Sequence, residues 1–114
     1  MKLSKLISLL QAKVITQTYN PDYEIKKGFA SDLMSDVLTV NTENMLLITG
    51  LNNIQTIRTA EMADINIIVI VRNKKVEQEM IDLAQENGIT LLECEYSLFK
   101  AVGILYNNDL ESVY

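Results

Sequence analysis

The chain has 114 residues, 48% of them hydrophobic, and a formal net charge of -5. This length and hydrophobic content predict a single folded domain spanning residues 1–114, and the acidic balance argues against nucleic-acid binding, which requires a basic face. The sequence has no histidine and one cysteine. It therefore lacks the commonest general base and zinc ligand, and its unpaired thiol fits a reducing cytoplasm, where we expect the protein to be.

The N-terminal segment is expected to form an amphipathic helix. Its apolar residues recur at the spacing of one helical face: Leu3, Leu6, Ile7 and Leu10. No apolar run approaches the ~20 residues of a membrane-spanning helix, so we expect no membrane partner. A short strand over residues 13–16 follows, and after a turn around the only proline a second strand is expected over residues 23–27.

Gly28 is expected to end that second strand. Ser31 or Asp32 can then cap a short helix, because their side-chain oxygens can accept a backbone N–H. This helix would end near Asn41. The apolar residues on one face of it are Leu33, Met34, Val37 and Leu38.

The centre of the chain, residues 45–72, has the pattern of a β-α-β unit. We expect strands over residues 45–49 and 66–71, joined by a helix whose apolar stripe begins at Ile54 and Ile57. The second strand is apolar almost without interruption. This predicts burial on both faces, as in a central parallel strand.

The remaining elements continue the same alternation. A helix marked by Val76, Met80, Leu83 and Ala84 is expected to end at Asn87, with Gly88 in the left-handed conformation. A strand over residues 89–93, a helix over residues 98–106 and a short tail follow. The order of elements predicts an α/β fold, a three-layer α/β/α sandwich with a mostly parallel central sheet of about five strands.

Three phrases of the sequence, in this order and spacing, resemble a DRTGG domain: GFASDLMSDVL (residues 28–38), LLITGLNNIQTIRTAEMADINIIVIVR (46–72) and YSLFKAVGILY (96–106). The resemblance covers nearly the whole chain and is more specific in the first two phrases. The chain has no contiguous Asp-Arg-Thr-Gly-Gly string. The family is similar to the N-terminal domain of HPr kinase/phosphorylase, which implies the same three-layer α/β/α fold.

This resemblance implies a regulatory or architectural role. Related DRTGG domains occur next to phosphotransacetylase domains and beside CBS domains in regulated pyrophosphatases, where they help to form a dimer interface and contribute to a diadenosine-polyphosphate site. A non-catalytic homodimeric module without a cofactor is therefore implied, with an adenine nucleotide or another phosphorylated small molecule as its ligand. Kinase chemistry is not implied, because no Gly-x-x-x-x-Gly-Lys-Ser/Thr string is present.

The sequence leaves two alternatives open. One is a protein-protein adaptor that docks on a separately encoded enzyme and has no small-molecule ligand. The other is a small phosphoester-cleaving enzyme that uses Asp32, Asp36 and Arg58, which we favour least because no histidine is present.

The turn after the strand 45–49 is the main candidate for a ligand site. Thr49, Gly50, Asn52 and Asn53 follow a predicted parallel strand and precede a helix, where free backbone N–H groups and the helix dipole favour an anion. The same residues also fit a tight turn, with Gly50 for backbone geometry and Asn53 as the helix cap. We favour this structural interpretation, because helix caps outnumber ligand sites.

Arg58 and Thr59 lie one turn into the helix that follows. Arg58 can hold a phosphate through two hydrogen bonds. It can equally pair with Glu61 three residues on, or cross a dimer interface, and we favour such a structural role.

Gly28, Asp32 and Asp36 form a secondary candidate set. The two aspartates are one helical turn apart, which would place both carboxylates on one face. Divalent metal sites usually need a third hard ligand, and the sequence offers none here, so we predict no metal site. Helix capping by Asp32 and solvation of Asp36 are the structural alternatives.

Half of the ten basic residues fall in two clusters, Lys26 with Lys27, and Arg72 with Lys74 and Lys75. These clusters can converge on an anion or occupy separate solvated loops, and we favour separate loops. Cys94 is interpreted as a small buried hydrophobic residue, because no histidine is present to activate it as a nucleophile.

Overall fold

The two apolar runs of the central β-α-β unit form neighbouring parallel strands in the computed structural model, which describes all residues from 1 to 114. β3 (Met45–Thr49) and β4 (Ile67–Ile70) are joined by α3 (Ile54–Met62), and every residue of both strands is buried. Their side chains alternate between the two faces of the sheet. Leu46 therefore packs in one hydrophobic cluster, and its neighbour Leu47 packs in the other.

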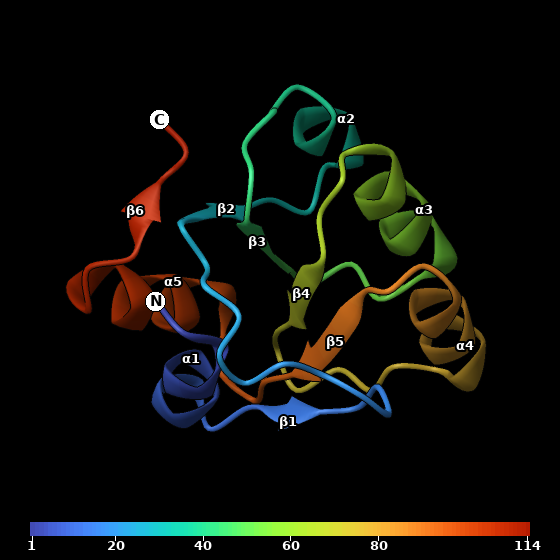
Figure 1. Cartoon of the computed structure of the whole chain (residues 1–114), viewed down its shortest axis with the longest axis horizontal. Coiled ribbons are helices and arrows are strands. Elements are labelled where there is room, and N and C mark those ends of the chain that lie inside the picture. The colour runs from blue at the N-terminus through green and yellow to red at the C-terminus, as the bar shows by residue number, and fades with distance from the viewer.

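The sheet has six strands in the order β1-β5-β4-β3-β2-β6 (Figure 1). The other strands are β1 (Lys13–Val14), β2 (Lys27–Ala30), β5 (Thr90–Glu93) and β6 (Glu111–Ser112). Only β1 is antiparallel to its neighbour, and all other pairs are parallel. The predicted mostly parallel α/β/α sandwich is confirmed, with one strand more than expected.

Helices cover both faces of the sheet (Figure 1). α1 (Leu3–Leu10) and α5 (Leu98–Asn107) pack on one face. The other face carries α2 (Met34–Val37), α3 and α4 (Gln78–Glu86). None of these helices has the length and hydrophobicity that crossing a bilayer would require.

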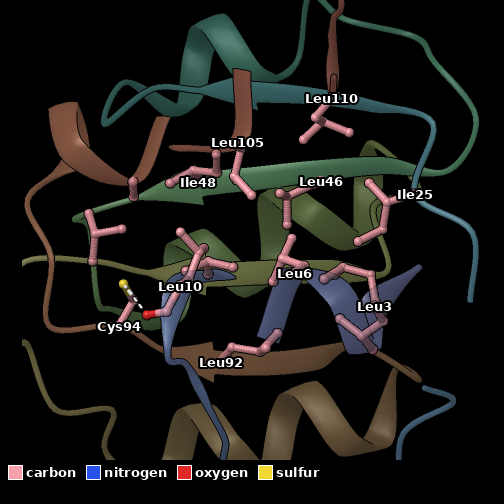
Figure 2. Packing of buried hydrophobic residues seen from close by; sticks show 14 residues of the cluster. Leu3, Leu6, Leu10, Ile25, Leu46, Ile48, Leu92, Cys94, Leu105 and Leu110 are labelled. Atoms are coloured by element: carbon pink, nitrogen blue, oxygen red, sulfur yellow. Dashed lines mark hydrogen bonds between the residues drawn. The ribbon is translucent and has the colours of Figure 1, made fainter. Parts of the chain in front are cut away.

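The apolar stripe of α1 is used within the chain. Leu3, Leu6 and Leu10 are at most 1% exposed and point at the sheet, where they meet residues of β3 and β5 such as Leu46 and Leu92 (Figure 2). This face of α1 is therefore covered by the chain's own sheet.

Cys94 belongs to the same hydrophobic cluster and is 2% exposed. Its thiol donates a hydrogen bond of 3.5 Å to the Leu10 carbonyl oxygen, which Figure 2 shows as a dashed line. Burial raises the pKa of the Cys94 thiol above its ordinary value. The interpretation of Cys94 as a buried hydrophobic residue is confirmed.

The predicted second strand was wrong in position. β2 runs over Lys27–Ala30 and contains Gly28, although glycine at this position predicts the end of a strand. Gly28 fits there because a Cβ at this position would lie only 3.0 Å from Leu110 Cδ2. The residues before β2 are held by the N-terminus instead, through Ile25 N–H to the Met1 carbonyl at 2.8 Å.

Two other elements differ from the expectation. α2 is a single turn that begins at Met34, and neither Ser31 nor Asp32 caps it. Leu33 and Leu38 are exposed, so only Met34 and Val37 of the predicted apolar face are buried. The strand β6 was missed because both of its residues are exposed and polar, which leaves no hydrophobic alternation to detect.

Candidate functional site

The carboxyl ends of β2, β3, β4 and β5 meet at one edge of the sheet, since these four strands are parallel to one another. Four connecting loops come together there: residues 31–33, 50–53, 71–77 and 94–97. Ligands of open α/β sheets bind at this edge. The turn after β3 lies at its centre.

The turn at Gly50 already holds an anionic group of the chain itself. One carboxylate oxygen of Asp32, Oδ1, accepts a hydrogen bond of 2.6 Å from the Gly50 N–H and another of 3.1 Å from Thr49 Oγ1. Asp32 belonged to the secondary candidate set, and Thr49 and Gly50 to the main one. The structure therefore brings members of both sets together.

The other polar groups of this turn also form hydrogen bonds within the chain. Thr49 Oγ1 accepts from the Leu51 N–H at 3.1 Å, and Asn53 Oδ1 accepts from the Thr56 N–H at 3.3 Å. The interpretation of Asn53 as the N-cap of α3 is thereby confirmed. Asn52 Nδ2 donates to the Lys75 carbonyl oxygen at 2.9 Å, which ties the turn to the loop after β4.

The loop after β4 brings two cations to Gly50. Lys74 Nζ donates a hydrogen bond of 2.6 Å to the Gly50 carbonyl oxygen. The Arg72 side chain lies against Gly50, because a Cβ there would be 3.1 Å from Arg72 Cδ and 3.4 Å from its Nη1. Only glycine permits this close approach without a shift of Arg72.

Arg72 has no acidic partner, and its guanidinium forms no hydrogen bond within the chain, whereas Lys74 donates to the Gly50 carbonyl oxygen. Lys75 pairs with Glu93, whose Oε1 is 3.8 Å from Lys75 Nζ. Arg72 is exposed and takes part in none of the three ion pairs of the chain. Its φ angle is +69°, and its N–H is held by the Tyr96 carbonyl at 2.8 Å. An exposed guanidinium without a carboxylate is free to meet an anion.

The DRTGG domain family model matches residues 5–107. The chain belongs to the DRTGG domain family. No curated protein matches the sequence.

A solved structure has the same fold as this DRTGG domain. It is the crystal structure of the CBS and DRTGG domains of the regulatory region of Clostridium perfringens pyrophosphatase, complexed with its activator, diadenosine tetraphosphate. The TM-score is 0.75 at 15% sequence identity. The match covers 91% of this chain and 45% of that chain, so the DRTGG domain spans less than half of the structure that it resembles.

Arg58 and Thr59 differ in solvent exposure. Arg58 is exposed on α3 and forms no ion pair, so the suggested pairing with Glu61 is absent. Thr59 is 2% exposed and packs inside the domain. Thr49 is completely buried as well, so Arg58 and Asn53 are the exposed side chains of the main candidate set.

The secondary set is split by the structure. Gly28 pairs with Leu46 and Ser112 in the sheet and faces Leu110. Asp36 is exposed on α2, whereas Asp32 precedes that helix, so the two carboxylates do not share a helical face. No group of three or more acidic or cysteine side chains is placed to hold a metal ion.

The two basic clusters lie at opposite edges of the sheet. Lys27 starts β2, whereas Arg72 and Lys74 follow the end of the parallel strand β4. The favoured interpretation, separate loops, is therefore confirmed, and one of the two clusters lies beside the main candidate turn. The sequence signal that points to this neighbour is simple: in a β-α-β unit, the residues after each parallel strand meet at one edge.

Proposed function

We propose that this DRTGG domain is a non-catalytic regulatory module that works as a homodimer and binds an adenine nucleotide or another phosphorylated small molecule. Membership of the DRTGG family and the fold shared with a pyrophosphatase regulatory region support this proposal. The ligand of that region, diadenosine tetraphosphate, belongs to the same chemical class. The proposed mechanism is a population shift, in which the bound ligand favours one arrangement of the dimer.

One observation carries the ligand class. Arg72 presents an exposed guanidinium without an acidic partner at the carboxyl edge of the sheet, beside the Gly50 turn. Guanidinium groups bind phosphate through two parallel hydrogen bonds. The Arg72 guanidinium could therefore donate hydrogen bonds to a phosphate group at this edge, although the overall charge of the chain is negative.

The non-catalytic role is supported by how the acidic side chains are used. Asp32 accepts two hydrogen bonds from the neighbouring turn, and Asp36 lies apart from it. General acid-base catalysis needs a titratable group poised beside the reacting atoms. A hydrolytic pair made of these two carboxylates does not fit this arrangement.

Calorimetry with ATP, AMP and diadenosine tetraphosphate tests the proposal, combined with light scattering of the free and saturated protein. We expect at least one of these nucleotides to bind with Kd below ~1 mM and to change the dimer population or its hydrodynamic size. A folded protein that binds none of them at that level has no nucleotide-sensing role.

The adaptor remains a second candidate, because α5 exposes large apolar side chains. Phe99 is 89% exposed and Tyr106 is 67% exposed, and their spacing of seven residues places them on one face of the helix. Single exposed apolar residues are common, but two aromatic residues on one helical face favour a protein contact. A stoichiometric enzyme partner that Phe99→Ala releases, with no response to nucleotides, would support the adaptor.

A further inference from the structure

The carboxylate of Asp32 lies where an external anion is expected in this fold. It accepts hydrogen bonds from the main-chain N–H of Gly50, just beyond the carboxyl end of β3, and from the hydroxyl of Thr49. These two donors sit at the edge where α/β sheets bind anionic ligands. The site therefore has its donors in place, and an internal acid occupies them.

We propose that a phosphate group of the ligand binds by replacing Asp32 at Gly50 N–H and Thr49 Oγ1, and that Arg72 is the side chain that meets this phosphate. This inference rests on the proposed function and assigns the atoms of that same site. Arg72 is placed for this role because its side chain lies against Gly50, so that Cδ and Nη1 are next to the turn.

The exchange is feasible because Asp32 is weakly restrained. Asp32 is exposed, and its second carboxylate oxygen accepts no hydrogen bond within the chain. It lies just before α2, a helix of four residues that begins without a side-chain cap. Movement of the carboxylate would leave the buried residues of α2, Met34 and Val37, in place.

The balance of charges favours the incoming group. A phosphate carries more negative charge than a carboxylate and offers three acceptor oxygens. It can keep both hydrogen bonds of Asp32 and add a contact to Arg72, which has no ion pair in the free protein. Asp32 thus acts as a competitor that raises the ligand concentration needed for binding.

The exchange also connects ligand binding to a surface. The hydrogen bonds of Asp32 fasten the loop 31–33 to the turn after β3. Within this loop, Leu33 is 58% exposed. Release of Asp32 would free the loop and change how the Leu33 side chain is presented, which is a local switch of the kind that regulatory domains use.

Asp32→Asn is the first test, with Asp36→Asn as the matched control. The amide oxygen of asparagine can still accept from Gly50 N–H and Thr49 Oγ1, so the turn should persist while the competing charge is lost. We expect Asp32→Asn to bind inorganic phosphate and ATP roughly fivefold more tightly, because the two hydrogen bonds that the competing side chain accepts are no longer charge-assisted. Asp36→Asn makes the same change in net charge four residues away and should stay within about twofold of the wild type.

Arg72→Asn and Arg58→Ala form the second pair. Asparagine tolerates the positive φ angle of residue 72, so the fold is kept while the guanidinium is removed. We expect Arg72→Asn to weaken ATP binding about tenfold or more, with Arg58→Ala near the wild type. Both arginines are exposed and unpaired, so nonspecific attraction would affect the two variants equally.

The exchange can also be tested in the wild-type protein, without any substitution. In NMR titrations with ATP, the Gly50 amide and the Asp32 side-chain carboxyl carbon should shift together, at the concentration where calorimetry detects binding. If the wild type binds ATP but Asp32→Asn binds no more tightly, or if the Asp32 carboxyl signal stays unchanged at saturation, the exchange does not occur while the proposed function survives. If neither the wild type nor Asp32→Asn binds any of these anions, both proposals are overturned.

Discussion

The two edges of the parallel sheet differ in how their polar side chains are used. At the carboxyl edge, side chains of one loop form hydrogen bonds with the main chain of another, as Asp32 does with the Gly50 N–H and Asn52 with the Lys75 carbonyl oxygen. A cleft at this edge is small, about 140 Å³, and is lined by Lys13, Lys74 and Lys75 and also by Glu93 and Glu95. This edge combines cross-loop hydrogen bonds with charge.

One cleft at the amino edge is larger, about 510 Å³, and none of its lining residues is acidic or basic. The edge itself does carry charge, because Lys27 starts β2 there. Among the residues that line the cleft, Asn20 and Asn87 bond within their own turns, while Asn66 and Thr90 form no side-chain hydrogen bond within the chain. The difference teaches that size does not mark the candidate site in this domain. Oriented donors and unpaired cations mark it, and they gather where the parallel strands end.

The largest expected effect comes from a pair of buried threonines, one at each edge. Thr49→Val removes a fully buried hydroxyl that both donates to Asp32 and accepts from the Leu51 N–H. We expect a loss of about 2 kcal/mol in the free energy of unfolding, because the partly buried Leu51 N–H and the Asp32 carboxylate both lose a partner. Thr90→Val removes a hydroxyl without a hydrogen bond and should stay within about 0.5 kcal/mol. Urea denaturation measures both, and equal losses would contradict the contrast between the edges.

Alanine substitutions at two glycines are expected to give the next largest effects. One should lower the stability and the other should weaken ATP binding. Gly88, at the amino edge, has a φ angle of +68° and open space around a would-be Cβ. Gly88→Ala should therefore cost about 1 kcal/mol or somewhat more of stability through backbone strain and leave ATP binding unchanged.

Gly50→Ala should show the opposite pattern. The φ angle of Gly50 is not positive, so alanine is compatible with its backbone, but the new Cβ meets Arg72 Cδ at 3.1 Å. The flexible arginine can move away, so the stability should change by less than about 1 kcal/mol, while ATP binding weakens severalfold. Thermal unfolding and calorimetry of the two variants check this crossover, and it fails if Gly50→Ala binds ATP like the wild type.

The sequence predicted the parts of the domain that hydrophobic periodicity controls. The strand Met45–Thr49 has the expected bounds, and Asn53 caps α3 as its position suggested. Each of these features is decided by neighbours in the chain: an apolar run in one case, a side chain three residues before the bonded N–H in the other.

The sequence did not predict features that depend on distant residues. Gly28 was placed outside a strand because glycine usually weakens one, but Leu110 needs the space over its Cα. Asp32 was assigned to a helix cap, and its partners are instead Thr49 and Gly50, which are 17 and 18 residues away. Chain order alone cannot show that these groups meet until the parallel pairing of β2 and β3 is known.

Removal of the α3 cap is expected to have a smaller effect. Asn53→Ala loses the acceptor for the Thr56 N–H and should cost about 1 kcal/mol of stability. Asn66→Ala, at the amino edge, removes an exposed amide without a hydrogen bond within the chain and should cost close to nothing. Chemical denaturation of both variants tests whether Asn53 is a structural residue. Asn53→Asp should retain the stability, because aspartate can also cap the helix. If that variant keeps its stability but loses ATP binding, Asn53 contacts the ligand.

The smallest effect is a pH dependence at Cys94, which follows β5 at the carboxyl edge. Its pKa is raised above the ordinary value of 9.0, chiefly because burial disfavours the thiolate. Below the ordinary value both states keep the proton, and stability does not depend on this group. As the pH rises above it, the unfolded chain releases the proton while the folded domain keeps it, so folding loses stability.

This loss can be isolated by comparing the wild type with Cys94→Val in urea denaturation between about pH 8 and pH 10. The other titrating groups are common to both proteins, so their contribution cancels in the difference. The wild type should lose more stability than the variant over this range, by at most about 1.4 kcal/mol per pH unit. Parallel pH curves, or rapid alkylation of the folded wild type, would mean that the thiol is open to solvent. The cleft that Cys94 lines at the carboxyl edge would then be deeper than the packing of Cys94 against the Leu10 carbonyl indicates.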